Sequence, residues 1–151
     1  MNRLFTMIIC TILIPAHIHA DQKDNAMHIG QRYIALLQSL STFNTEKFND
    51  DCVALFSPTI KKVINSKIVC TNRKELMDQM LSIVQTYGIK NVDQLELIRD
   101  NDDTLTIIRF EITFNDNTTE CVISIIKADR TGLIEEINEV FGEKEAYQWT
   151  P

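Results

Sequence analysis

Glycine, proline and histidine are scarce in this chain, which has 4, 3 and 3 of them among 151 residues. The low glycine and proline content excludes collagen-like chains and flexible linkers. Hydrophobic residues make up 44% and charged residues 24% of the chain, which is the composition of a globular protein and not of a disordered one. The length indicates one domain.

Histidine and closely spaced cysteine ligands are missing where a metal site or a nucleophilic enzyme would need them. His28 is the only histidine after residue 20, and no cysteine pair has metal-ligand spacing. A zinc site of the usual type and a Ser-His-Asp or Cys-His arrangement are therefore not expected. We predict no metal and no other cofactor. His28 should be exposed early in the first helix, although a lone titrating group there is also a candidate base.

Long apolar runs are absent after the first 20 residues, and residues 1–20 themselves resemble a secretory signal peptide. Arg3 precedes an apolar stretch at 4–14, Pro15 breaks it, and Ala20 is a small residue suited to cleavage. The stretch is shorter than the roughly 20 apolar residues of a membrane span. We expect an exported protein, periplasmic or secreted, with a mature domain at 21–151 and no membrane attachment after cleavage. An uncleaved N-terminal anchor is the alternative.

Basic residues are too few for a polyanion-binding surface. Cleavage would remove Arg3 from the 15 basic residues and leave 14 against 21 acidic ones, a net charge of −7. Nucleic-acid binding rests on Lys and Arg at phosphates, so nucleic acid is not an expected partner. Docking on an anionic membrane surface is disfavoured for the same reason. The adjacent pair Lys61 and Lys62 is expected on a solvated face.

The first half of the mature chain has helical periodicity. Apolar residues recur at three- and four-residue steps over 24–40, which predicts a helix. A second, shorter helix can be capped by Asn44 or Thr45 and stops near Pro58. Two short strands around a turn are expected over 60–70.

A third helix and a sheet follow. Asn72 provides a capping-box-like start for the helix, and Gly88 provides its stop. Beyond residue 92 the period changes to two, and short polar turns separate the runs. Strands are expected around 95–97 and at 104–114, 119–127 and 133–141. This order predicts an α+β fold, in which a curved antiparallel sheet wraps around three helices as a cone with an internal cavity.

Four short stretches carry a family resemblance: QRYIA at 31–35, ALF at 54–56, GLI at 132–134 and VFGE at 140–143. Together with the order helix, helix, hairpin, helix and meander, they resemble the nuclear transport factor 2-like superfamily, of cystatin-like fold. Its members include ketosteroid isomerases, SnoaL-like polyketide cyclases and small binding modules.

The resemblance implies roles for particular residues. Tyr33 matches the tyrosine of the isomerase oxyanion hole, and a second donor falls at Ser124. The base is expected near 63–65, where Val, Ile and Asn cannot act as a carboxylate does. The complete isomerase set is therefore absent, and Tyr33 and Ser124 can equally be core residues. The ligand-binding residues predicted for the cavity are Tyr33, Phe56, Phe110 and Ser124.

The mature chain has three cysteines, Cys52, Cys70 and Cys121. The resemblance allows the first two to be neighbours, and a bridge between them would close a loop of about 19 residues and contribute roughly 3 kcal/mol. Three buried reduced thiols are the alternative.

Three functions remain open from the sequence. The first is a non-catalytic module that binds an apolar small molecule or forms a homodimer through the exposed sheet face. The second is an isomerase- or cyclase-type enzyme that uses Tyr33 and an unidentified acid, with Asp93, Glu96 and Glu120 as candidates. The third is a component of an envelope or secretion complex.

Overall fold

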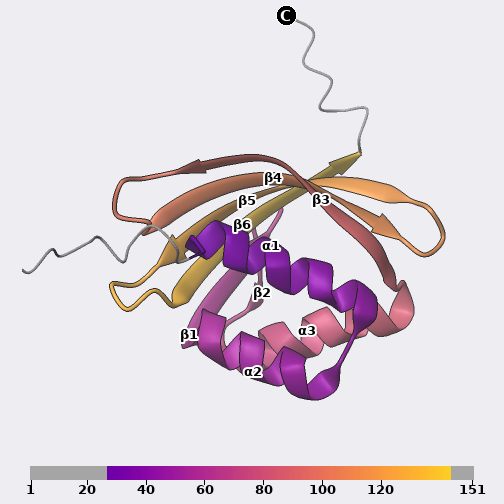
Figure 1. The fold of residues 1–151 in the computed structure, drawn as a ribbon, viewed down its shortest axis with the longest axis horizontal. Helices are drawn as coiled ribbons and strands as arrows, with labels where there is room; N and C mark the ends of the chain where they lie inside the picture. Colours follow the sequence, from indigo (N-terminus) through magenta and orange to yellow (C-terminus); the bar gives the residue numbers. More distant parts are fainter. Residues whose placement is uncertain (1–26, 144–151) are drawn as a thin grey trace, which may run out of the picture.

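The computed structural model describes residues 27–143 of the chain. The predicted signal peptide at 1–20 and the C-terminal aromatic residues Tyr147 and Trp149 lie outside the described residues. Three α-helices cover one face of a single six-stranded sheet, which is curved and unclosed (Figure 1). The predicted α+β architecture is confirmed.

The helices are α1 (Ile29–Ser39), α2 (Thr45–Leu55) and α3 (Arg73–Thr86), and a short 3-10 helix, η2 (Leu40–Thr42), extends α1. Asn44 and Asn72 cap α2 and α3 as expected, because their side chains accept hydrogen bonds from backbone N–H groups three residues later, at 2.9 and 3.0 Å. Gly88 follows α3 with a φ of +64°, a conformation that glycine adopts without strain.

The second helix ends earlier than its apolar pattern suggested. The helix was expected to stop near Pro58, but Phe56 begins the first strand and Pro58 lies within that strand. A residue that precedes proline avoids the helical region, so the chain is extended before Pro58.

The six strands comprise a hairpin and a meander. In spatial order the sheet runs β2, β1, β6, β5, β4, β3. The strands are β1 (Phe56–Ile64), β2 (Lys67–Cys70), β3 (Ile89–Arg99), β4 (Leu105–Phe114), β5 (Thr119–Ala128) and β6 (Ile134–Glu143).

The strand pairs are antiparallel except for β1 and β6, which are parallel. This pair is the one departure from the expected antiparallel sheet. It arises because α3 carries the chain to the far edge of the sheet, and four meandering strands then return to the middle beside β1. The last strand therefore lies next to the first, and their side chains can meet.

Alternation along the strands divides the sheet into two faces. Ile108, Phe110 and Ile112 of β4 are buried against the helices, whereas Leu105 and Ile107 are exposed on the opposite face. The helices leave that outer face uncovered (Figure 1). The core, and any site within it, therefore lies between the inner face and the helices.

Candidate functional site

A small cavity lies between the inner face of the sheet and the helices. Its volume is about 50 Å³, enough for on the order of three water molecules. Most of its lining is apolar, but three polar side chains reach it, those of Tyr33, Lys62 and Glu139. The apolar lining comprises Leu37, Leu40, Met80, Ile83, Ile89, Phe110, Ile112, Phe114 and Phe141.

The register of the sheet brings the polar residues together. Ser124 on β5 is the direct cross-strand partner of Glu139 on β6. Lys62 on β1 pairs with Ile137, which is two residues before Glu139 and therefore on the same face. A long lysine side chain spans this diagonal separation. Tyr33 reaches the same point from the buried side of α1.

Two hydroxyl donors and one ammonium group converge on one carboxylate. The Tyr33 hydroxyl donates a hydrogen bond of 2.6 Å to Oε1 of Glu139, and the Ser124 hydroxyl donates one of 2.9 Å to the same oxygen. The other oxygen, Oε2, lies 2.9 Å from Nζ of Lys62. The side chains of Lys62 and Glu139 are only 6% and 2% exposed, so this is a buried ion pair. Its charges are compensated within the protein.

Burial keeps the phenol in its protonated form. The pKa of Tyr33 is raised well above 10.0, first by desolvation, then by the charge of Glu139 and by the hydrogen bond that the phenol donates to it. Phe56 and Phe110 hold the ring from two sides, edge to face, with centroid distances of 6.3 and 6.5 Å. Tyr33 is therefore a fixed hydrogen-bond donor.

The four residues that the sequence predicted to bind a ligand in the cavity do not all line it. Tyr33 and Ser124 donate to the same oxygen, as a pair of donors would in an oxyanion hole, but the oxygen belongs to the protein. Phe110 lines the cavity. Phe56 is fully buried against Tyr33 and is not among the lining residues.

The expectation that the cavity lacks a proton acceptor is wrong. The stretch 63–65 contributes nothing to the lining, but Lys62 and Glu139 do. Lys62 was expected on a solvated face, yet it is buried. The acids considered as candidates are all exposed on strands, namely Asp93, Glu96 and Glu120.

A period-two signal for both missed residues was present in the sequence. Lys62 follows Ile60 by two residues, and both are buried on β1. Glu139 lies between Ile137 and Phe141 in the same alternation on β6, so its side chain faces inward with theirs. Their charge had suggested that both side chains face solvent. The alternation of buried residues along the strands was the stronger evidence.

The cysteines are free thiols. Cys52, Cys70 and Cys121 are buried and unbridged, so the proposed Cys52–Cys70 disulfide is absent. The Cys70 thiol instead donates to Oε1 of Gln79 at 3.5 Å. Desolvation raises the pKa of Cys52 from 9.0 to about 12 and also raises the pKa of Cys70. These thiols behave as small hydrophobic groups.

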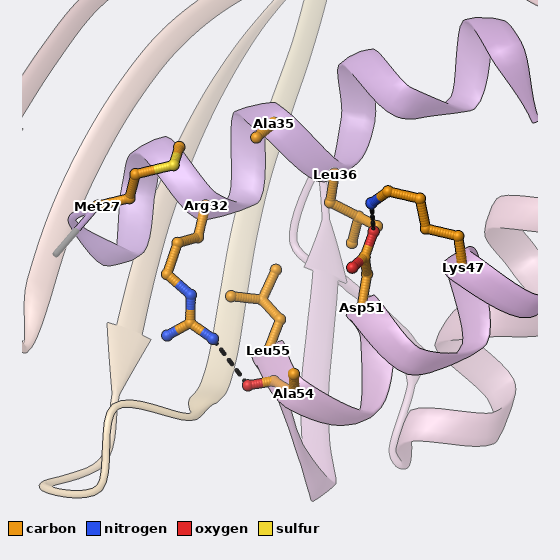
Figure 2. Close-up of a pocket in the computed structure, with 8 residues that line it drawn as sticks. All are labelled: Met27, Arg32, Ala35, Leu36, Lys47, Asp51, Ala54 and Leu55. Carbon is orange, nitrogen blue, oxygen red and sulfur yellow. Dashed lines mark hydrogen bonds and ion pairs between the residues drawn. The ribbon is translucent and has the colours of Figure 1, made fainter.

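A second hollow, of about 280 Å³, lies on the surface between α1 and α2 (Figure 2). Its charged groups are engaged: Arg32 donates to the Ala54 carbonyl at 2.8 Å and the Gly132 carbonyl at 3.3 Å, and Lys47 pairs with Asp51. Because its charged side chains already have partners, this hollow is a weaker candidate for a ligand-binding site than the cavity.

His28 is remote from the candidate site. It caps α1, and its Nδ1 lies 2.5 Å from Nη1 of Arg99 and 3.5 Å from Oδ2 of Asp103. It does not line the cavity. Among residues 27–143, no three His, Cys, Asp or Glu side chains are grouped closely enough to hold a metal ion. The helices of the same region include none long and apolar enough to cross a membrane.

Solved structures share this arrangement of helices and strands. A protein from Agrobacterium tumefaciens, assigned as an isomerase of the SnoaL-like family, superposes with a TM-score of 0.63 at 10% identity, covering 76% of this chain and 94% of its own. A nuclear transport factor 2-like protein of unknown function from Exiguobacterium superposes with a TM-score of 0.61 at 18% identity, covering 77% of this chain and 99% of its own. The chain has the nuclear transport factor 2-like fold.

A protein from Sinorhizobium meliloti assigned as a polyketide cyclase has the same fold, with a TM-score of 0.56 at 12% identity and coverage of 74% of this chain and 92% of its own. Nuclear transport factor 2-like folds thus include cyclases and isomerases as well as proteins of unknown function. No protein-family model and no curated protein sequence matches this chain. One fold hosts many activities, so the fold alone does not determine what this chain does.

Proposed function

We propose that this protein binds a small, largely apolar molecule in the cavity, with a polar group of that molecule at Tyr33, Lys62 and Glu139. One observation carries the proposal: three buried polar side chains converge on an otherwise apolar cavity. Ligand sites typically combine an apolar lining with a few placed polar groups that fix orientation.

The ion pair favours binding over proton abstraction. The carboxylate of Glu139 accepts from Tyr33 and Ser124 and contacts Lys62. A carboxylate has about four acceptor positions, so most of its capacity is already used. If Glu139 took a proton from a substrate, the buried ammonium of Lys62 would lose its counter-charge, which is costly in a desolvated site.

A calorimetric titration of the full chain with octanol, whose hydroxyl end is small enough for the cavity, tests this binding function. The variant Ile112→Phe, which fills the cavity from β4, should weaken binding about tenfold or more, equivalent to a change of about 1.4 kcal/mol in binding free energy. Ile107→Phe adds the same bulk on the opposite face of the same strand and should leave binding unchanged. Absence of octanol binding, or equal loss in both variants, would count against the cavity as the site.

A second candidate function is isomerase-type proton transfer, which the contact between Tyr33 and Glu139 favours. The phenol lies 2.6 Å from a carboxylate that can act as a base, and it can stabilise an enolate once its hydroxyl turns from Glu139 to the substrate. The probe is cyclohexenone in D2O, with deuterium incorporation followed by NMR. Incorporation that is lost in both Tyr33→Phe and Glu139→Gln supports catalysis. Incorporation at the rate of the buffer control rules it out for this probe.

We also propose that two copies pair through the outer face of the sheet. Ile98, Ile107 and Ile125 form a row of neighbours across β3, β4 and β5 and are 55%, 36% and 38% exposed. Val140 of β6, 50% exposed, adds to this apolar surface. A two-fold interface uses the same patch on both subunits, and a continuous apolar row is suited to that.

The oligomeric state tests the homodimer. Light scattering of the full chain should give the mass of two copies, and Ile107→Glu should give the mass of one. Val53→Glu places the same charge on an exposed position of α2, where Val53 is 54% exposed, and should leave the dimer intact. A monomer at all concentrations of the unmodified chain excludes the proposal.

Export is the last part of the proposed function. Residues 1–20 are proposed to direct the chain out of the cytoplasm and to be removed after Ala20, in keeping with the signal-like pattern of charge, apolar stretch and small residue. The intact mass of the exported chain should correspond to a start at Asp21. A mass that includes residues 1–20 indicates the anchored alternative.

A further inference from the structure

An open groove adjoins the cavity. It has a volume of about 400 Å³ and lies where the β1–β2 hairpin, the end of α3 and the β4–β5 turn meet. Three side chains, those of Ile83, Phe114 and Phe141, line both the groove and the inner cavity. The two spaces therefore adjoin one another at these apolar side chains. The remaining groove residues are Ile64, Asn65, Tyr87, Asp116, Thr118 and Glu120.

The groove has an aromatic wall. Tyr87 is 60% exposed, and its ring lies 5.9 Å from that of Phe114 at an angle of 58°. An exposed tyrosine that packs against a residue shared by the groove and the cavity offers an amphipathic surface to a ligand. Together with Ile64, Ile83 and Phe141, it gives the groove enough apolar surface to hold the body of a molecule that the inner cavity is too small to admit.

Charge limits which molecules fit the two spaces. The inner ion pair of Lys62 and Glu139 is compensated. The groove carries Asp116 and Glu120, and no basic residue is among its described lining residues. Hydrogen bonds from Thr118, first from its hydroxyl and then from its backbone, lower the pKa of Asp116, which is therefore ionised at neutral pH.

We infer that the groove and the cavity form one site for a neutral, elongated molecule, with its apolar body in the groove and an uncharged hydroxyl head at Lys62 and Glu139. The inference rests on the proposed binding function. An anionic head would meet Glu139 inside and two acids at the rim. A cationic head would face the ammonium of Lys62. A head group of either charge would add an uncompensated charge beside the desolvated pair of Lys62 and Glu139, which costs free energy.

The free hydrogen-bonding positions favour a hydroxyl. Lys62 has three N–H donors and forms an ion pair with Glu139, whose carboxylate has about one acceptor position left after its three contacts. A ligand hydroxyl can accept a hydrogen bond from Lys62 and donate one to Glu139 at the same time. A ketone can only accept.

Three probes with the same apolar body test the ligand class: octanol, octanoate and octylamine, titrated into the full chain at pH 7. Octanol should bind about tenfold more tightly than either charged probe. Glu120→Lys should reduce the difference in affinity between octanoate and octanol, because it replaces an acidic groove residue with a basic one. Tighter binding of octanoate than of octanol would overturn the inference while leaving the binding function intact. If none of the three binds, the proposed function fails, and this inference with it.

A second pair of variants tests the groove. Thr118→Trp fills it from the exposed β4–β5 turn and should weaken octanol binding several-fold. Ala35→Trp adds the same side chain to the separate hollow between α1 and α2 (Figure 2) and should not. Octanol binding that Thr118→Trp leaves unchanged would refute the two-space site.

Discussion

The ammonium of Lys62 and the carboxylate of Glu139 lie 2.9 Å apart, with both side chains almost fully buried. They come from strands that are parallel neighbours in the sheet although 77 positions separate them in the sequence. A buried pair of this kind contributes little stability compared with apolar side chains of the same size, but removing one partner leaves an uncompensated charge. The pair therefore points to a site more than to a stabilising contact.

Breaking the ion pair from one side should destabilise the protein strongly. We expect Lys62→Met and Glu139→Gln each to lower the free energy of unfolding by about 3–5 kcal/mol, because each leaves one buried charge without its partner. The double variant should cost less than the sum of the two, as coupled residues do. Urea denaturation of the four proteins measures this. Strict additivity would mean that the two groups do not interact.

Removing the phenol hydroxyl should weaken the same cluster by a smaller amount. Tyr33→Phe keeps the ring contacts with Phe56 and Phe110 but removes a hydrogen bond to a charged group, which is worth about 1.5–3 kcal/mol. The exposed Tyr87 provides the control, since Tyr87→Phe should change stability by no more than about 0.5 kcal/mol. Equal effects of the two substitutions in urea denaturation would contradict the role of the Tyr33 hydroxyl.

Stability should decline at alkaline pH. The pKa of Cys52 is about 12 in the folded state against 9.0 for an ordinary thiol, and that of Tyr33 is also raised. Above pH 9 the unfolded chain loses these protons first, so unfolding becomes easier as pH rises toward the folded values. Each group contributes a slope of at most about 1.4 kcal/mol per pH unit.

Substitutions can show which groups cause the loss of stability at alkaline pH. Cys52→Ala should flatten the dependence of unfolding free energy on pH mainly above pH 9, and Tyr33→Phe should flatten it mainly above pH 10. Both proteins are compared with the unmodified chain by urea denaturation at a series of pH values. An unchanged slope in both variants would show that other groups govern alkaline unfolding.

A close approach between α1 and β4 depends on Gly30. A Cβ at this position would lie 2.6 Å from Cγ2 of Thr106 and 3.1 Å from side-chain atoms of Ile108 and Leu97. Overpacking costs about 1–3 kcal/mol, whereas alanine gains at most about 1 kcal/mol of helix propensity over glycine.

Gly30→Ala should therefore lower the free energy of unfolding, despite its better helix propensity. Gly132→Ala is a useful comparison, because a Cβ there meets nothing within 4 Å and only the φ of +82° opposes it. Thermal unfolding of both variants distinguishes a packing cost from a backbone cost. A stabilised Gly30→Ala protein would show that the helix can shift without loss.

Local patterns account for most of the predicted elements. The alternation over 104–114 anticipated β4 to within a residue, and Asn44 and Asn72 marked the starts of two helices, because caps and periodicity act over a few neighbouring residues. The end of α2 was missed at Phe56, where the effect of Pro58 on the preceding backbone outweighs the apolar helical spacing.

The candidate site was predicted only in part. Tyr33 and Ser124 were selected through the family resemblance, and the structure does bring them together. Lys62 and Glu139 were not selected, because a charged residue is ordinarily solvated and only a partner makes its burial tolerable. The partner of each charged residue lies on another strand. Neither strand's own sequence shows the register that brings Lys62 and Glu139 together.

The amino-acid sequence by itself determined the α+β order, the turns and the apolar faces of helices and strands, since these depend on residues close together in the chain. Only the tertiary structure decided that β6 lies parallel to β1, and therefore that one lysine and one glutamate meet beneath a tyrosine. Pairing of distant strands is set by how the whole sheet closes over the helices, and the charge balance of the cavity follows from that closure.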